Sequence, residues 1–332
     1  MPPTLKDVAE RAGVSRAAVS RTFTDGASVS PKMRRKVEKA ADELGYSPNA
    51  LASSLTTGRT KLIGLVSNNF HNPIFLEVFD LFTRGLQDRG LRPLLVNLSD
   101  ETDPANSVRM LRQYSVDGVV VASSTLLPGF AKAFRDAGVP VVHSFGRYAS
   151  APEVHVVGID NVECGRMAAR ELLRRGYHDV AFLGGPETAT STQDRLKGFL
   201  EELRLHPDVS VRYTFADAYS FNAGRAEMLK RLKDNPAEAY FCGDDVLSIG
   251  ALSAVTDSGL SVPDNIGLIG LNDMEMAGWQ NINLTTIRQP ISQIIASSIE
   301  LIVSMLENPD RYPEARLFPC QVIERGTLKP VV

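Results

Sequence analysis

Hydrophobic and polar positions follow two different patterns along the chain. In residues 1–60 the apolar side chains recur at helical spacing, as in Met33, Val37, Ala40 and Leu44. The rest of the chain alternates short, continuous apolar runs with stretches of helical periodicity. We therefore expect a small all-helical head followed by a much longer α/β body.

Start and stop signals divide the head into three helices. Thr4 is a favourable N-cap for a first helix, which Gly13 ends. Ser15 begins a second helix, and Ser30-Pro31 opens a third that Gly45 ends. Two short helices joined by a tight, glycine-containing turn are typical of the helix-turn-helix motif.

The second predicted helix carries side chains suited to DNA near its start, the part that reaches base edges in the major groove. Arg16 and Arg21 can pair with guanine, and Ala17 leaves room for a thymine methyl. Serine hydroxyls and helix N-termini can bond phosphates. The alternative is a three-helix protein-interaction module with a solvated basic face. The predicted DNA contacts of the head are Thr4, Ser15, Arg16, Ala17, Ser20 and Arg21.

The body alternates apolar runs with amphipathic stretches, which predicts buried parallel strands connected by helices in a doubly wound α/β architecture. There are too many such units for one sheet of ordinary size, so we expect two lobes. Ligands of doubly wound sheets bind at the carboxyl ends of strands. The runs begin at Leu62, Pro93, Gly118, Val139, Val154, Val180, Tyr240 and Gly267.

Charge is distributed unevenly between head and body. The 332 residues carry a net charge of −3, yet residues 1–60 carry +4 and the remainder −7. A basic head on an acidic body indicates that only the head meets a polyanion. The three cysteines, far apart in sequence and among apolar neighbours, are typical of buried free thiols. With no apolar run long enough for a membrane and no secretory signal, we expect a cytoplasmic protein.

Residues 4–65 resemble the lac repressor and purine repressor family, nearly residue for residue. The resemblance implies that Asn49 to Thr57 folds into a hinge helix on DNA and that Leu55 wedges into the minor groove. Many members carry Arg where this chain has Ser53, so hinge contacts of Asn49, Ser53 and Leu55 with DNA are expected to be weaker here. The matching stretches are Thr4-Leu5-Lys6-Asp7-Val8-Ala9, Ala12-Gly13-Val14-Ser15, Val19-Ser20-Arg21, Gly45-Tyr46-Ser47-Pro48-Asn49 and Thr57-Gly58-Arg59-Thr60.

The resemblance extends over the body and implies the two-lobed fold of periplasmic sugar-binding proteins, with three chain crossings near Asp160, Gln289 and Pro319. We therefore expect a DNA-binding domain at 1–48, a hinge at 49–60 and an effector-binding and dimerisation domain at 61–332. Lobe 1 would comprise about 61–159 and 291–318, and lobe 2 about 160–289 and 319–332. The matching motifs are Gly158-Ile159-Asp160-Asn161, Gly184-Gly185-Pro186, Arg195-Leu196-Lys197-Gly198-Phe199, Gly243-Asp244-Asp245, Leu284-Thr285-Thr286-Ile287-Arg288-Gln289-Pro290 and Ile323-Glu324-Arg325.

By position in this resemblance, ten residues are expected to bind a small effector. Their types suit a polar ligand, since arginine offers a fork of donors, carboxylates and amides accept from hydroxyls, and aromatic rings stack on a sugar or a base. Trp279 either lines the cleft or packs against its wall. The expected effector residues are Asn72, Phe75, Phe145, Asp160, Ser191, Arg195, Tyr219, Asp244, Asn272 and Gln289.

Two of these positions depart from the family pattern. Relatives usually have Asn-Asp at Asp244-Asp245 and Asp-Asp at Asn272-Asp273, so an acid and an amide have changed places. If Asp244 pairs with Arg195, the cleft is balanced and suits a neutral sugar or polyol, which we favour. If it does not, the unpaired guanidinium favours a carboxylate or phosphate on the ligand.

Other classes of protein fit the sequence less well. It has no nucleotide-binding glycine loop, no Gly-x-Ser-x-Gly elbow and no histidines at metal-ligand spacing, so we expect no enzyme, cofactor or metal. A secreted sugar receptor would fit the body alone, but not the DNA-binding head. We expect a repressor, associated with the nucleoid, that binds a near-palindromic DNA site as a homodimer without a membrane partner.

Overall fold

The structure is a computed structural model that describes residues 3–24, 26–49, 54, 58–98, 103–309 and 311–331. The chain forms two compact units, residues 1–61 and 62–332, and each is described by itself. Ser53, Leu55 and most of the predicted hinge helix lie outside the described residues.

The first unit has the three predicted helices, with the predicted caps. Thr4 accepts a hydrogen bond from the backbone of Asp7, whose carboxylate bonds back to Thr4, and Gly13 ends the helix in the left-handed region at φ +58°. Ser15 and Ser30 cap the next two helices by accepting hydrogen bonds from the backbone of Ala18 and Met33. A small apolar core of Val8, Ala9, Ala12, Val19, Val37, Ala40 and Ala41 holds together α1 (Leu5–Ala12), α2 (Arg16–Thr22) and α3 (Pro31–Leu44).

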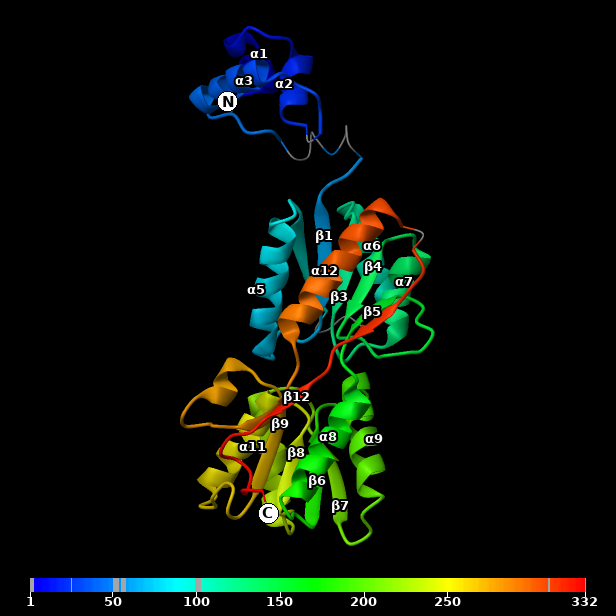
Figure 1. The fold of residues 1–332 in the computed structure, drawn as a ribbon, viewed down its shortest axis with the longest axis vertical. Coiled ribbons are helices and arrows are strands. Elements are labelled where there is room, and N and C mark those ends of the chain that lie inside the picture. Colours follow the sequence, from blue (N-terminus) through cyan, green and yellow to red (C-terminus); the bar gives the residue numbers. More distant parts are fainter. Residues whose placement is uncertain are drawn as a thin grey trace. The chain divides into compact units, whose positions relative to one another are not determined.

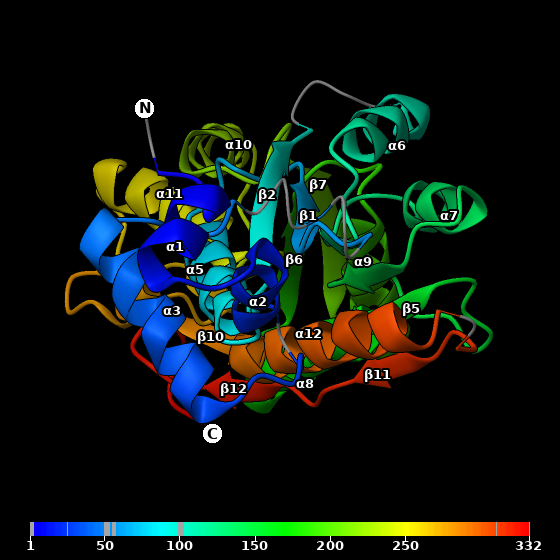
Figure 2. The same ribbon diagram turned by 90° about the horizontal axis from the view of Figure 1, so that it is seen from above.

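The second unit contains two six-stranded sheets, which confirms the expected α/β fold with two lobes. The first sheet has the order β11-β5-β4-β3-β1-β2 and all its strands are parallel. Helices α5 and α12 cover one face, and α6 and α7 cover the other (Figures 1 and 2). Its strands are β1 (Leu62–Ser67), β2 (Arg92–Asn97), β3 (Gly118–Ala122), β4 (Val141–Ser144), β5 (His155–Gly158) and β11 (Ala315–Leu317), and its helices are α5 (Ile74–Gln87), α6 (Pro104–Gln113), α7 (Pro128–Asp136) and α12 (Ile291–Glu307).

The second sheet has the order β12-β10-β9-β8-β6-β7, and only β12 runs antiparallel to its neighbour. Helix pairs α8 with α9 and α10 with α11 pack beside it (Figure 1). Its strands are β6 (Asp179–Gly184), β7 (Ser210–Phe215), β8 (Ala239–Cys242), β9 (Gly267–Asn272), β10 (Thr285–Arg288) and β12 (Gln321–Ile323); its helices are α8 (Asn161–Arg174), α9 (Thr190–Leu203), α10 (Phe221–Lys233), α11 (Asp245–Asp257) and the 3-10 turn η1 (Glu275–Gly278).

The chain passes between the two sheets three times. It leaves the first sheet after β5, returns through α12 after β10, and leaves again between β11 and β12. Two of these passages lie side by side, since the backbone N–H of Phe318 donates to the carbonyl of Gly158 at 2.9 Å. In Figure 1 the two lobes meet where these segments cross. The carboxyl ends of the parallel strands in both sheets lead to this boundary.

Candidate functional site

Helix α2 exposes one continuous face to solvent. Arg16, Ala17, Ser20 and Arg21 are all exposed, whereas Val19 is completely buried between the helices. This spacing of one, four and five residues places the four side chains on one surface of the helix. Their predicted DNA contacts therefore require no rearrangement of the head.

The other DNA contacts predicted for the head are also exposed. The hydroxyls of Thr4 and Ser15 act as helix caps, accepting hydrogen bonds from backbone N–H groups at 3.4 and 3.2 Å. Each keeps lone-pair capacity for a second partner. Asn49 is exposed at the end of the described part of the head. Roles for Ser53 and Leu55 remain predictions on residues that are not described.

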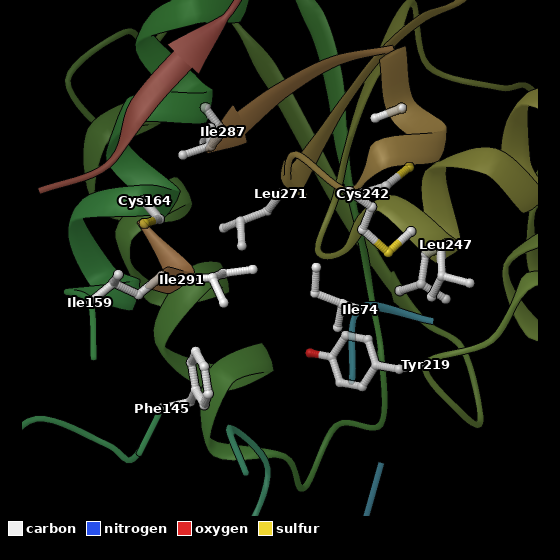
Figure 3. Close-up of a cluster of buried hydrophobic side chains, with 14 of the residues drawn as sticks. Ile74, Phe145, Ile159, Cys164, Tyr219, Cys242, Leu247, Leu271, Ile287 and Ile291 are labelled. Carbon is white, nitrogen blue, oxygen red and sulfur yellow. The ribbon is translucent and has the colours of Figure 1, made fainter. Parts of the chain in front are cut away.

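A small cavity of about 20 Å³ lies at the boundary of the two lobes, and both lobes contribute to its wall. Eight of the ten expected effector residues line it. Figure 3 shows part of its apolar wall, with the rings of Phe145 and Tyr219 near Ile74 and Ile159. The cavity is lined by Asn69, Asn72, Ile74, Phe75, Val78, Ser124, Phe145, Ile159, Asn161, Arg195, Tyr219, Asp244, Asn272 and Gln289.

A chain of hydrogen bonds crosses the cavity wall and joins the lobes. The buried Asp244 carboxylate accepts from the side-chain amides of Asn72 at 2.9 Å and Asn272 at 2.8 Å. Asn72 follows β1 in one lobe, and Asn272 ends β9 in the other. The amide of Gln289 donates to Asn272 Oδ1 at 2.6 Å. The acid and amide that have exchanged places relative to the family pattern thus bond directly to each other.

Arg195 contributes a buried positive charge to the same cavity. Its Nε donates to Asn161 Oδ1 at 2.8 Å, and its Nη1 donates to the carbonyl of Gly243 at 2.5 Å. Among the described residues no carboxylate lies within ion-pair distance of it, so Asp244 does not replace the pairing that the family pattern would provide. Burial raises the pKa of Asp244, and the charge of Arg195 partly opposes that rise.

Aromatic rings form the apolar side of the cavity. Phe75 and Phe145 meet edge to face with their centroids 6.4 Å apart. Phe145 adopts a left-handed backbone conformation at φ +63°, which is unusual for a bulky residue and aims its ring into the cavity wall. The Tyr219 hydroxyl bonds Thr192 at 2.6 Å and Ser191 at 3.2 Å, so its ring is held in place.

Two expected effector residues do not line the cavity. Asp160 caps α8, accepting from the backbone of Val162 and Glu163 at 2.9 and 3.0 Å. Ser191 is buried behind Tyr219, and its backbone N–H donates to the carbonyl of Ser124 in the other lobe. Roles for both in direct ligand contact are therefore less favoured than an indirect one. Trp279 is about half exposed and is absent from the cavity wall.

Six cavity residues were not predicted from the sequence, and three of them are polar: Asn69, Ser124 and Asn161. Asn161 directly follows Asp160 in the motif that pointed to the site, so the motif reaches the cavity wall through the residue next to the predicted one. Asn69 and Ser124 follow β1 and β3, where the general rule for strand ends could have indicated them.

The loop after β9 is anchored by the buried Asp245. Its carboxylate accepts from the backbone N–H of Met274 at 2.8 Å and from the Thr286 hydroxyl at 2.5 Å. Burial raises the pKa of Asp245 to about 7, and the neighbouring Asp244 and Asp273 contribute to the rise. The protonation state of Asp245 thus bears on the loop that carries Asn272.

Further bonds close the two lobes on each other beside the cavity. Arg147, after β4, forms a two-pronged ion pair with Asp194 of α9, with Nε 2.9 Å from Oδ2. The Thr190 hydroxyl donates to the carbonyl of Ser124 at 3.0 Å. These bonds hold the two lobes closed on each other beside the small cavity.

The described residues offer no cluster of three or more His, Cys, Asp or Glu side chains that could hold a metal ion. Within that same part of the chain, no helix is long and apolar enough to cross a membrane. The cavity itself carries amides, rings and one charge of each sign, which are groups that bind a polar organic molecule by hydrogen bonds and stacking.

An exposed helix-turn-helix surface and a closed cavity between two α/β lobes together define a ligand-responsive DNA-binding protein. Residues 4–49 match the bacterial regulatory proteins of the lacI family, and residues 169–328 match the periplasmic binding protein-like domain. The HTH-type transcriptional regulator DegA of Bacillus subtilis (strain 168) is 31% identical over 340 residues, covering 100% of this chain and 99% of DegA.

Solved structures agree with this. The lac repressor dimer bound to operator and the anti-inducer ONPF matches with a TM-score of 0.88 at 25% identity, covering 99% of this chain and 100% of that one. The transcriptional regulator CelR in complex with cellobiose matches with a TM-score of 0.71 at 28% identity, covering 98% and 99%. The chain belongs to the lacI family: it is a transcription regulator that binds DNA under the control of a small-molecule effector, and not an enzyme.

Proposed function

We propose that the protein is a repressor whose affinity for a near-palindromic operator is controlled by a neutral sugar or polyol bound in the cavity between the lobes. The observation that carries the proposal is the cavity wall, in which five side-chain amides, one carboxylate and one guanidinium face aromatic rings. Hydroxyl groups both donate and accept, so they match this mixture, and a sugar's apolar face matches the rings.

The proposed DNA binding is based on helix α2 and on the hinge. Arg16 and Arg21 read base edges, while Ser15, Ser20 and the helix N-termini hold phosphates. Residues 49–60 form the hinge, in which Leu55 opens the minor groove. Two copies of the chain bind together, as in the lac repressor dimer on its operator. We place this action in the cytoplasm, at the nucleoid.

The proposed sugar binding is based on the hydrogen bonds that close the lobes. Asn72 reaches across to Asp244 at 2.9 Å, and a ligand hydroxyl of similar geometry can exchange for that amide without leaving the carboxylate unsatisfied. Arg195 belongs to a separate set of hydrogen bonds, in which Asn161 and the carbonyl of Gly243 accept from it. Its guanidinium has further N–H groups that a ligand oxygen could accept from. CelR, a structural neighbour, holds cellobiose.

A sugar acid is the second candidate, because Arg195 has no ion-pair partner within the described residues. A ligand carboxylate or phosphate would supply the missing counter-charge. Since Arg195 and Asp244 do not pair, the condition stated above for a neutral ligand is not met. We retain the neutral ligand on a second ground, because an anion in the cavity would meet the buried Asp244 carboxylate, whose charge repels it. The neutral ligand is therefore the better fit.

The test begins with selection of the operator from random duplex DNA by the purified protein. Fluorescence anisotropy of the selected duplex is then followed while neutral sugars, polyols and their matched sugar acids are added. A neutral compound that changes operator affinity, and whose effect is lost in Phe145→Ala but kept in Tyr114→Ala on the outer surface, supports the proposal. A response to the acids alone would replace it with the second candidate.

A further inference from the structure

Two thiols that lie 156 positions apart in the sequence meet where the chain crosses between the lobes. The Sγ atoms of Cys164 and Cys320 are 3.5 Å apart. Cys164 lies in the first turns of α8, and Cys320 lies in the short segment between β11 and β12. All three cysteines are free thiols, as expected, and Cys164 and Cys242 are buried, but Cys320 is only partly buried, which corrects the expectation for that residue.

We propose that Cys164 and Cys320 form a site of reversible oxidation, at which a hydroperoxide converts the two thiols into an intrachain disulfide between adjacent crossing segments. The two cysteines differ in solvent exposure, as expected for a pair in which one thiol reacts with the oxidant and the other completes the disulfide. Cys320 is partly open to solvent, while Cys164 is buried behind it. In Figure 3 Cys164 lies on the same side of the apolar cluster as Ile159 and Ile291, away from Cys242.

The charges around the pair distinguish the two sulfurs. The hydrogen bond from Cys164 lowers the pKa of Cys320, and the positive charge of Arg195 adds to this effect. The same hydrogen bond, together with burial, raises the pKa of Cys164 well above its ordinary value. Asp160 opposes ionisation of either thiol. The sulfur of the partly buried Cys320 is thus the better nucleophile, and that of the fully buried Cys164 is suited to resolve the product.

The reaction balances in two steps. The Cys320 thiolate attacks the peroxide, so that an S–O bond forms, the O–O bond breaks and the leaving oxygen takes up a proton as water or an alcohol. Cys164 then attacks Cys320 Sγ, forming the S–S bond and releasing a second oxygen as water with the proton of the Cys164 thiol. Two thiols have lost two electrons, and the hydroperoxide has gained them.

The disulfide would act on the part of the body that moves when the lobes open. Cys320 belongs to the last crossing and Cys164 to the helix that follows the first, and these crossings already share the bond from Phe318 to Gly158. A covalent link there limits the rotation of one crossing against the other. Oxidation would therefore hold the lobes near their closed arrangement.

The test maps the thiols of the full-length protein with hydrogen peroxide as the oxidant. After oxidation, free thiols are blocked with N-ethylmaleimide and the peptides are identified by mass spectrometry without reduction. Free thiols are expected to fall from three to one per chain, with a single cross-linked peptide pair containing residues 164 and 320. Dithiothreitol should restore all three.

Matched variants separate this chemistry from general oxidation. Cys242 is fully buried and burial raises its pKa to about 12, so Cys242→Ser should leave the cross-link unchanged. Cys320→Ser should abolish it, and Cys164→Ala should leave a sulfenic acid at Cys320 that dimedone captures. Amide exchange in residues 318–323 should slow on oxidation of the wild type and of Cys242→Ser, but not of Cys320→Ser or Cys164→Ala. Retention of three free thiols in the folded wild type, or cross-links that include Cys242, would overturn the proposal.

Discussion

Asp244 and Asn272 show how two departures from a family pattern can compensate each other. Each alone would put two acids or two amides side by side, but together they keep one acid and one amide bonded at 2.8 Å. Sequence comparison identified the exchange and left its meaning open. Only the geometry shows that the two positions contact each other, because 28 residues of chain separate them.

This pairing predicts a strong interaction between the two positions. Asn272→Asp should bring two carboxylates together in a buried site and destabilise the body by roughly 3 kcal/mol at pH 7.5. The loss should shrink as the pH falls, because one carboxyl then binds a proton. Urea unfolding of the single variants and of Asp244→Asn/Asn272→Asp measures the coupling. The double variant should recover to within about 1 kcal/mol of wild type; equal losses that simply add would refute the pairing.

Arg21 is the residue of α2 best suited to test DNA reading. Its side chain is exposed, and its Nε bonds only back to the carbonyl of Ala17 at 3.3 Å. Arg21→Ala should cost about 1–3 kcal/mol on the selected operator and much less on random duplex, as expected for a base contact. Arg35→Ala removes the same charge from α3 and is the control. Equal losses on both duplexes in the Arg21 variant would indicate a phosphate contact instead.

At the scale of elements, the sequence predicted the helices and strands whose ends are determined by local signals such as caps and apolar runs. The helices of the head were located nearly to the residue, because Thr4, Ser15 and Ser30 cap them. Strand β7 was not predicted, because it is an edge strand with mostly exposed side chains and has no apolar run. Strands β11 and β12 have three residues each, too few for a period to be recognised.

The cavity could be predicted only in part, for the same reason. Positions after strands and within family motifs were found, and eight of the ten line the wall. The choice between Asp160 and its neighbour Asn161 depends on which side chain caps α8, and both are good helix-capping types. Ser191 lies beside the cavity, but it contacts Tyr219 and the other lobe rather than lining the wall. These outcomes depend on side-chain direction, which spacing alone does not specify.

Asp245 connects three elements and should make their stability depend on pH. It begins α11, bonds the loop at Met274 and bonds β10 at Thr286. Since its pKa in the folded protein is about 7, above the ordinary 3.8, folding favours its protonated form. Its contribution is fully present below about pH 4 and is lost as the pH rises through 7.

Asp245→Asn should remove this dependence while keeping the shape of the side chain. Wild type should lose stability relative to the variant between about pH 4 and 7, by at most about 1.4 kcal/mol per pH unit. Thermal unfolding of both proteins across that range gives the difference. Asp257→Asn changes an exposed acid at the other end of α11 and should run parallel to wild type. A constant difference between wild type and Asp245→Asn would show that Asp245 stays ionised throughout.

At the scale of the molecule, closure of the lobes depends on few bonds between them. Asn72 to Asp244 and the two bonds to the Ser124 carbonyl lie at the cavity, while Arg147 and Asp194 form an ion pair at its side. The pair is only partly exposed, so its contribution to closure is on the order of 1 kcal/mol. That is large beside the small free-energy differences on which a ligand-driven equilibrium operates.

Reversing this ion pair tests whether it controls closure. Arg147→Glu should place a second acid against Asp194 and shift the body toward open forms, with a larger radius of gyration in small-angle X-ray scattering. Arg147→Glu/Asp194→Arg restores opposite charges and should return the radius to that of wild type. Arg170→Glu, which breaks ion pairs within one lobe only, is the control. A ligand that binds between the lobes must supply the free energy that closes them. Arg147→Glu should therefore also lower the affinity for the effector by about tenfold, or 1.4 kcal/mol. Unchanged scattering and affinity in Arg147→Glu would mean that the cavity bonds alone hold the lobes together.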